Sequence, residues 1–145
     1  MRIMALDIGE VRCGIAISDP AERVASPICV LPTAEVRAHA ASFRRVCDDW
    51  EPELIVSGLP LSLSGELGKQ AETCKEIALQ VGKNLSLPVE FSDERLSSSE
   101  AKRVLREKGY SEKQMRGKVD MIAASIFLQS WLDARLSLSE ERNKG

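Results

Sequence analysis

Acidic side chains stand at three places where an expected strand ends or an expected helix begins. Asp7 ends a short apolar run, Asp93 and Glu94 follow an expected strand, and Asp120 lies in the first turn of the last expected helix. In open α/β sheets, ligands gather beyond the carboxyl ends of parallel strands, so these side chains are candidates for one shared site. The neighbours of Asp120 are small and apolar, where a carboxylate is costly unless a cation or hydrogen-bond donors accompany it.

Carboxylates with no His or Cys beside them suit a hard cation that prefers oxygen ligands, Mg²⁺ or Mn²⁺, better than zinc. This donor set is typical of metal-assisted phosphodiester hydrolysis. Each acidic residue also has a purely structural interpretation: Asp7 terminates a strand, Asp93 is a turn residue, and Asp120 complements a helix dipole. The residues alone leave both interpretations open.

A basic segment lies between Glu94 and Asp120. Residues 95–118 hold eight bases against three acids, a local charge of +5 in a chain whose net charge is −2. The segment could contact backbone phosphates beside a metal site, or it could be a solvated helix face with ordinary i,i+4 ion pairs. The small total charge and 4% aromatic content argue against a protein that coats nucleic acid by bulk charge or by base stacking. The bases are Arg95, Lys102, Arg103, Arg106, Lys108, Lys113, Arg116 and Lys118.

Serine-containing loops are weaker candidates. The loop 58–65 precedes an expected helix and could place a phosphate at its N-terminus, but Lys69 does not stand in the P-loop spacing, so a structural turn is favoured. The serines at 97–99 suit a helix N-cap or a hydroxyl lining near Glu94. No serine has a catalytic base, because the lone His39 falls in an expected helix, where a structural role is more common.

The cysteines show neither a zinc pattern nor a disulfide pattern. Cys13, Cys29, Cys47 and Cys74 form no C-x-x-C pair, and we expect reduced thiols in a cytoplasmic protein. No apolar run is long enough to cross a membrane. With 145 residues, 43% of them hydrophobic, we expect one domain over residues 1–136 and a polar tail over 137–145.

Hydrophobic periodicity predicts the element order β-β-β-α-β-α-β-α-α, an α/β domain on a mixed sheet. Three antiparallel strands come first, with Pro27 marking an edge strand or a strand start, and strand-helix-strand units then add parallel strands. Thr33 is the expected N-cap of one helix that reaches Trp50. The expected strands are 2–7, 13–17, 25–31, 53–57 and 88–91. A second helix follows the fourth strand, with its apolar face formed by Leu67, Ala71, Cys74, Ala78 and Val81. Two further helices are expected over 98–108 and 118–136.

Four motifs, in this order along residues 5 to about 132, resemble the YqgF family, also called RuvX and described as Holliday junction resolvase-like. They are Asp7-Ile8-Gly9 with Arg12, Gly14 and Ala16-Ile17-Ser18-Asp19; Gly58-Leu59-Pro60 with Gly65; Asp93-Glu94-Arg95-Leu96-Ser97-Ser98; and Lys118-Val119-Asp120 with Ala123-Ala124. The resemblance implies a ribonuclease H-like fold with a five-stranded mixed sheet flanked by helices.

The resemblance also implies a metal-dependent nuclease, with Asp7, Glu94 and Asp120 as catalytic residues and ligands of Mg²⁺ or Mn²⁺. Arg12 and Arg95 are expected to contact nucleic acid, as are the downstream bases Lys102, Arg103, Arg106, Lys113, Arg116 and Lys118. The implied role is processing of the 5′ end of the 16S ribosomal RNA precursor, while some members look like resolvases of four-way DNA junctions.

The chain departs from the family pattern at a few positions, and none of them removes a carboxylate. Glu10-Val11 replaces a more usual basic residue, Cys13 takes an aliphatic position, Ser64 stands for Asp, and Ser97-Ser98 stands for a Thr pair. The change at Glu10 could weaken a phosphate contact next to Asp7.

Several alternatives to an RNA nuclease are open. A DNA junction resolvase needs two paired active sites, an actin-like kinase needs a second lobe, and a non-catalytic RNA-binding module would not need the carboxylates. The expected partners are therefore structured RNA or branched DNA and no membrane, with the chain as a monomer or homodimer.

Overall fold

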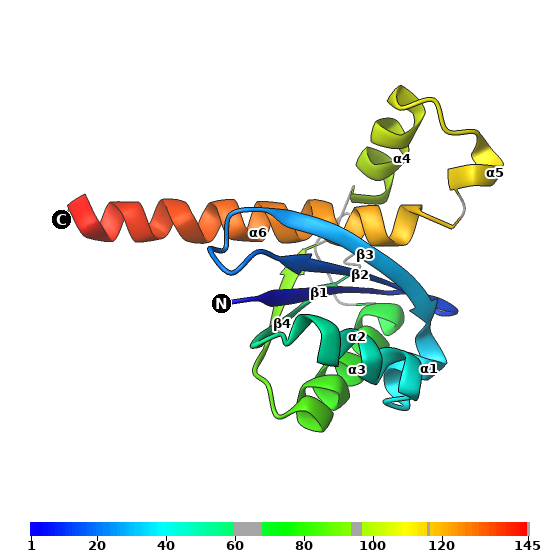
Figure 1. Ribbon diagram of the computed structural model, residues 1–145, viewed down its shortest axis with the longest axis horizontal. Helices are drawn as coiled ribbons and strands as arrows, with labels where there is room; N and C mark the ends of the chain where they lie inside the picture. Colours follow the sequence, from blue (N-terminus) through cyan, green and yellow to red (C-terminus); the bar gives the residue numbers. More distant parts are fainter. Residues whose placement is uncertain (60–67, 94–96, 116, 145) are drawn as a thin grey trace.

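A five-stranded mixed sheet forms the centre of the protein. The computed structural model describes residues 1–59, 68–93, 97–115 and 117–144 (Figure 1). The sheet order is β3-β2-β1-β4-β5, with antiparallel pairing of β1 to β2 and β2 to β3 and parallel pairing of β1 to β4 and β4 to β5, as predicted. The strands are β1 (Ile3–Ile8), β2 (Arg12–Ser18), β3 (Ala25–Pro32), β4 (Leu54–Leu59) and β5 (Val89–Asp93).

Helices cover both faces of this sheet. In Figure 1, α1, α2 and α3 lie on one face, α6 crosses the other, and α4 packs on α6. Within the described residues, no helix combines the length and apolarity needed to cross a membrane. The helices are α1 (Thr33–Arg37), α2 (Ala41–Trp50), α3 (Lys69–Leu85), α4 (Ser97–Glu107), α5 (Glu112–Met115) and α6 (Val119–Lys144).

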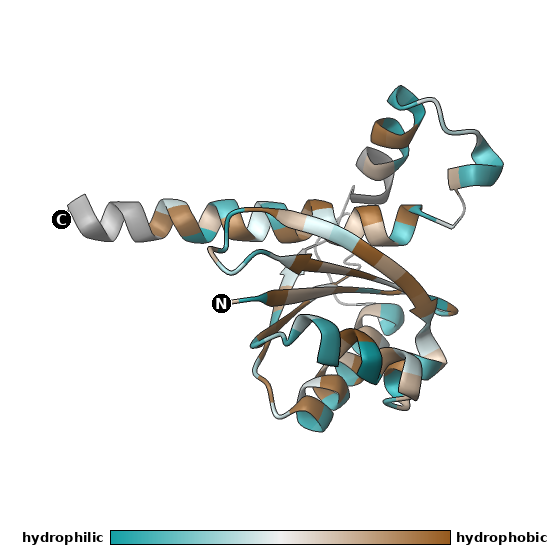
Figure 2. Ribbon diagram, viewed as in Figure 1, coloured by the Kyte–Doolittle hydropathy of each residue, from teal (hydrophilic) through white to brown (hydrophobic). Residues whose placement is uncertain are grey.

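The central strand β1 divides its side chains between two hydrophobic clusters. Leu6 and Ile8 pack with α1–α3, and Ile3 and Ala5 pack with α6. Figure 2 shows the apolar character of this strand along its length. Because side chains alternate along a strand, Asp7 belongs to the face that α6 covers.

The segment after β3 differs from the single helix predicted. The backbone leaves helical geometry at His39, whose φ of 55° is left-handed, so α1 and α2 are separate helices. Thr33 is not the N-cap either: Pro32 holds that position, and the Thr33 hydroxyl donates a 2.8 Å hydrogen bond to the Gly9 carbonyl. Thr33 therefore fastens α1 to the β1–β2 turn.

Three other boundaries differ from the prediction. Asp93 is the last residue of β5 and does not follow the strand. The short helix α5 was not predicted, although Ser111 and Gln114 form a reciprocal capping box at its start, with N···O distances of 2.8 and 3.3 Å. Helix α6 continues to Lys144, beyond the predicted end at 136, because neither proline nor glycine interrupts the chain before Gly145.

The edge position of β3 agrees with the prediction from Pro27. Its pairing with β2 shifts register between Ile15 and Ala16, so the strand carries a bulge next to this proline. At its start, the Ala25 N–H donates a 2.9 Å hydrogen bond to the side chain of Gln129 on α6. This bond ties the edge strand to the helix beneath it.

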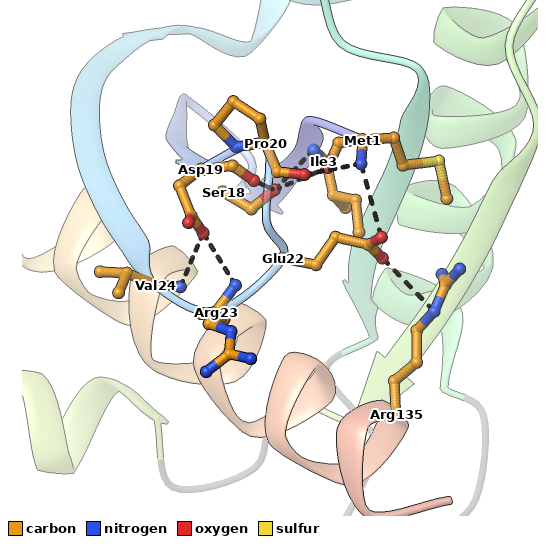
Figure 3. A network of polar contacts seen from close by, with 9 residues as sticks. All are labelled: Met1, Ile3, Ser18, Asp19, Pro20, Glu22, Arg23, Val24 and Arg135. Carbon is orange, nitrogen blue, oxygen red and sulfur yellow. Dashed lines mark hydrogen bonds and ion pairs between the residues drawn. The ribbon is translucent and has the colours of Figure 1, made fainter. Parts of the chain in front are cut away.

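A polar network joins the first residue, the β2–β3 loop and α6 (Figure 3). The Met1 ammonium group donates to the Pro20 carbonyl at 2.9 Å and lies 3.4 Å from the Glu22 carboxylate. Arg135 of α6 approaches the other oxygen of Glu22, also at 3.4 Å. Such partly exposed ion pairs contribute about 0–1 kcal/mol each, so their effect is mainly to fix the geometry of the loop.

Ser18 is the buried member of this region, and its loss should be costly. The Ser18 hydroxyl oxygen accepts a 2.8 Å hydrogen bond from the buried Ile3 N–H. We expect Ser18→Ala to lower the free energy of unfolding by about 1–3 kcal/mol, because the N–H would lose its partner. Urea unfolding measures the change, with exposed Ser26→Ala as the control; equal effects of the two substitutions would contradict this role.

Asp19 should make the stability of the loop depend on pH. Backbone N–H groups of Val24 and Arg23 donate to its carboxylate at 2.9 and 2.8 Å, and these bonds lower its pKa. A lowered pKa in the folded state stabilises the protein at neutral pH, and this contribution disappears as the pH falls below the ordinary aspartate value of about 3.9.

We therefore expect Asp19→Asn to be less stable than the wild type at neutral pH, with a difference that shrinks on acidification from about pH 5 to pH 3. Urea unfolding across this range measures the difference. The control is Asp49→Asn, at an exposed position on α2. A gap between wild type and Asp19→Asn that stays constant with pH would refute the prediction.

Candidate active site

Two of the predicted catalytic residues, Asp7 and Asp120, both lie next to Gly14. Asp7 of β1 pairs directly with Gly14 of β2, and directly opposite residues in antiparallel strands share a face of the sheet. A Cβ atom at Gly14 would lie 2.1 Å from the Asp120 carbonyl oxygen and 2.6 Å from the Met121 nitrogen. The first turn of α6 therefore rests on the backbone of β2, beside Asp7.

The charges at this contact act on a buried thiol. Burial raises the pKa of Cys13 well above its ordinary value, and the negative charges of Asp7 and Asp120 raise it further. The thiol is therefore protonated. Cys13 belongs to the hydrophobic cluster that packs with α1–α3, on the face of the sheet opposite Asp7.

Asp120 is a half-buried acid with a cation beside it. Burial raises the pKa of its carboxyl group, and Arg12 opposes this shift. The Arg12 Nε atom lies 3.9 Å from an Asp120 carboxylate oxygen. The ionised form of Asp120 thus depends on nearby positive charge, as its apolar sequence neighbours suggested.

The third predicted carboxylate, Glu94, lies outside the described residues, as do Arg95 and Arg116. The strand before it is described: Asp93 pairs in register with Leu59, and β1, β4 and β5 run parallel, so their carboxyl ends share one edge of the sheet. Among the described residues, no group of three or more His, Cys, Asp or Glu could hold a metal ion. Of the three predicted carboxylate residues, the structure thus describes Asp7 and Asp120 and leaves Glu94 undescribed.

The remaining basic residues of the predicted interface lie on and around α4 and α5. In Figure 2, most of α5 and the end of α4 nearest the α4–α5 connection are hydrophilic, next to a hydrophobic part of α4. Lys102 and Lys113 are exposed. Arg103 lies 3.0 Å from Glu107, which is one of the predicted i,i+4 pairs, and Arg106 lies 3.4 Å from Glu112.

Lys118 places its ammonium group 4.9 Å from the centre of the Tyr110 ring, at the entry to α6. Because α6 begins one residue later, this cation stands close in the chain to Asp120. The basic segment therefore leads into the helix that carries the carboxylate.

Other candidates from the sequence have structural or undescribed positions. Residues 60–67 of the proposed phosphate loop lie outside the described residues, as do the side chains of the serines at 97–99. His39 is partly buried and places its ring edge-on to Phe43, with 6.2 Å between ring centres, in agreement with a structural role. All four cysteines are free thiols.

Gly14 is the position whose importance the sequence alone did not reveal. A glycine inside an otherwise apolar strand is a signal of close backbone approach, and here the approaching segment is the first turn of α6.

The fold is ribonuclease H-like and resembles that of two solved Holliday junction resolvases. The structure of RuvC from T. thermophilus in complex with a Holliday junction superposes with a TM-score of 0.56 at 15% identity, covering 94% of this chain and 96% of that one. The resolvase of fowlpox virus with its Holliday junction substrate gives a TM-score of 0.58 at 14% identity, covering 94% and 99%. At these identities the similarity concerns the fold.

Residues 1–134 match the family described as RuvX: Holliday junction resolvase, and the chain belongs to this family. It is also 40% identical over 135 residues to a protein of Anaeromyxobacter sp. (strain Fw109-5) named "Putative pre-16S rRNA nuclease", covering 93% of this chain and 98% of the relative.

A side chain at Gly14 should separate α6 from the sheet. We expect Gly14→Ala to destabilise the fold by about 1–3 kcal/mol, since the added methyl group would meet backbone atoms that cannot rotate away. Urea unfolding measures the loss, and Gly117→Ala is the control because nothing lies within 4 Å of its Cβ position. A Gly14→Ala protein as stable as the control would show that α6 is not seated as described.

Proposed function

We propose that the protein is a metal-dependent endonuclease that hydrolyses structured RNA, with the precursor of 16S rRNA as its substrate. The observation that carries the proposal is that Asp7 and the first turn of α6, which contains Asp120, lie beside the same residue of β2, Gly14. The name shared by its relatives supports the choice of substrate.

The donor chemistry of the site fits Mg²⁺ or Mn²⁺. Asp7 and Asp120 offer carboxylate oxygens, whereas the Cys13 thiol is buried in the cluster on the other face of the sheet and its raised pKa keeps it protonated. Asp7 and Asp120 would hold the metal, and we propose Glu94 as a third ligand. When bound, the ion supplies Lewis-acid stabilisation of charge on the phosphate and favours ionisation of water.

The reaction adds water across one phosphodiester bond. The water oxygen forms a new bond to phosphorus, the bond to the leaving oxygen breaks, and that oxygen takes up a proton. The chain's own residues would orient the substrate for this step: Arg12, beside Asp120, faces a position where a phosphate oxygen could bind. Lys102 and Lys113, with the other bases around α4 and α5, would hold the backbone on either side.

A four-way DNA junction is the second candidate substrate. The description of the family as a Holliday junction resolvase favours it. Symmetric cutting of a junction requires two active sites held together, so this candidate predicts a stable homodimer in solution.

Cleavage assays with two carboxylate variants test the proposal. We expect Asp7→Asn and Asp120→Asn each to cut precursor 16S rRNA at least about 100-fold more slowly than the wild type in Mg²⁺, because each removes a charged ligand worth several kcal/mol in the transition state. Asp48→Asn, at an exposed position on α2, is the matched control. Circular dichroism and urea unfolding establish that the variants are folded.

The same enzyme preparation is tested on a four-way DNA junction. Cleavage of RNA alone supports the proposal, and cleavage of the junction alone, by a dimer, supports the second candidate. Wild-type rates in either carboxylate variant would refute the nuclease mechanism, and RNA binding without cleavage would identify a non-catalytic module.

A further inference from the structure

A cavity of about 650 Å³ opens beside the β1–β2 turn, on the face of the sheet opposite Asp7. Ile8, Cys74 and Ile77 are buried and line its apolar part. The Cys74 thiol donates a 3.1 Å hydrogen bond to the Ile8 carbonyl, so α3 is fastened to β1 at this point. The volume lies within the range of about 300–1,000 Å³ that is usual for small-molecule sites.

Two cations from different helices line the same cavity. Arg37 ends α1, Lys69 begins α3, and both side chains belong to exposed residues. The N-cap of α3 is Gly68, which has no side chain to satisfy the N–H groups of the first turn. The positive end of a 17-residue helix and two basic side chains therefore surround one part of the cavity, which favours a phosphate there.

The other polar groups suit the rest of a nucleotide. Gln70 and Thr73 lie along α3 beside the apolar residues. The Gln70 amide can donate to and accept from a base edge, and the Thr73 hydroxyl, which donates to the Lys69 carbonyl at 3.1 Å, can accept from one. Glu10, from the β1–β2 turn, brings a carboxylate to the cavity, where it can accept hydrogen bonds from ribose hydroxyl groups. Flat base faces are apolar enough to pack on Ile8 and Ile77.

We infer that this cavity binds one ribonucleoside monophosphate unit, either as a free nucleotide or as a nucleotide of an RNA strand. Arg37 and Lys69 bind the phosphate, Glu10 binds the ribose, and the apolar part receives the base. The second source rests on the proposed nuclease function, whereas binding of the free nucleotide does not.

The cavity and the candidate active site lie on opposite faces of the same strand, β1. Asp7 and Ile8 are neighbours in β1, and the alternation of side chains sends them to opposite faces. An RNA strand that fills both sites must therefore pass over the β1–β2 turn, where Gly9 and Glu10 line the cavity.

NMR titration of the ¹⁵N-labelled full chain tests the cavity, in EDTA so that cleavage plays no part. The probes are AMP, dAMP and inorganic phosphate. We expect AMP to shift the amide signals of Ala34, Gln70 and Thr73, to bind more tightly than phosphate, and to bind several-fold more tightly than dAMP. Arg37→Ala and Lys69→Ala should each weaken AMP binding about tenfold, since each removes one charge-assisted hydrogen bond.

Lys83→Ala, in the last turn of the same helix, is the matched control and should bind AMP as the wild type does. Glu10→Gln should bring AMP affinity close to that of dAMP. The inference is overturned if AMP leaves the cavity signals unchanged, if phosphate binds as tightly as AMP, if dAMP and AMP bind equally, or if the control loses affinity as much as Lys69→Ala does.

A competition experiment identifies the source of the nucleotide. A short single-stranded RNA that displaces AMP assigns the cavity to a substrate strand, and one that leaves AMP bound assigns it to a free nucleotide. The titration and the competition both measure equilibrium binding in the absence of metal. A failed cleavage assay would therefore count against the proposed function and not against the cavity, and a failed titration would count against the cavity alone.

Discussion

The contact between the backbone of β2 and the first turn of α6 is the constraint on which the site depends. At Gly14 the two backbones approach so closely that a single methyl group has no room. This approach brings the first turn of α6, with Asp120, beside Asp7, and the basic segment ends at Lys118, two residues before Asp120. It also buries part of Asp120, and the resulting rise in its pKa is opposed by Arg12. Packing thus decides the electrostatics of the site.

The sequence predicted the order of elements and the mixed sheet, because hydrophobic periodicity and the strand-helix-strand pattern are local signals. It did not predict the break at His39, since nothing in the helical periodicity marks a single left-handed residue. The Ser111 and Gln114 capping box was visible in the sequence and was overlooked. The role of Gly14 could not be deduced in this way, because it depends on a helix more than a hundred residues further along the chain. The family motifs predicted Asp7, Glu94 and Asp120 as catalytic residues, and all three assignments stay predictions.

The two faces of β1 have different chemistry. One face ends in the carboxylate of Asp7, and the other ends in Ile8 above a cavity with cations at its edge. A strand's period of two is enough to separate the candidate active site from the proposed nucleotide-binding cavity by one residue. Thr33 and Cys74 both donate hydrogen bonds to carbonyl groups of this stretch, so α1 and α3 hold it from the cavity side.

The arrangement of Asp7, Gly14 and Asp120 also has a consequence for the order of folding. The β1–β2 hairpin, which contains Asp7 and Gly14, can form from residues that are close in the chain. Asp120 belongs to α6, the last helix of the chain, and can join them only after α6 has packed on the sheet. Contacts between distant segments form late, because the entropy of closing the long intervening loop must first be overcome. A nascent chain on the ribosome therefore lacks the complete carboxylate pair until nearly all of it has been synthesised.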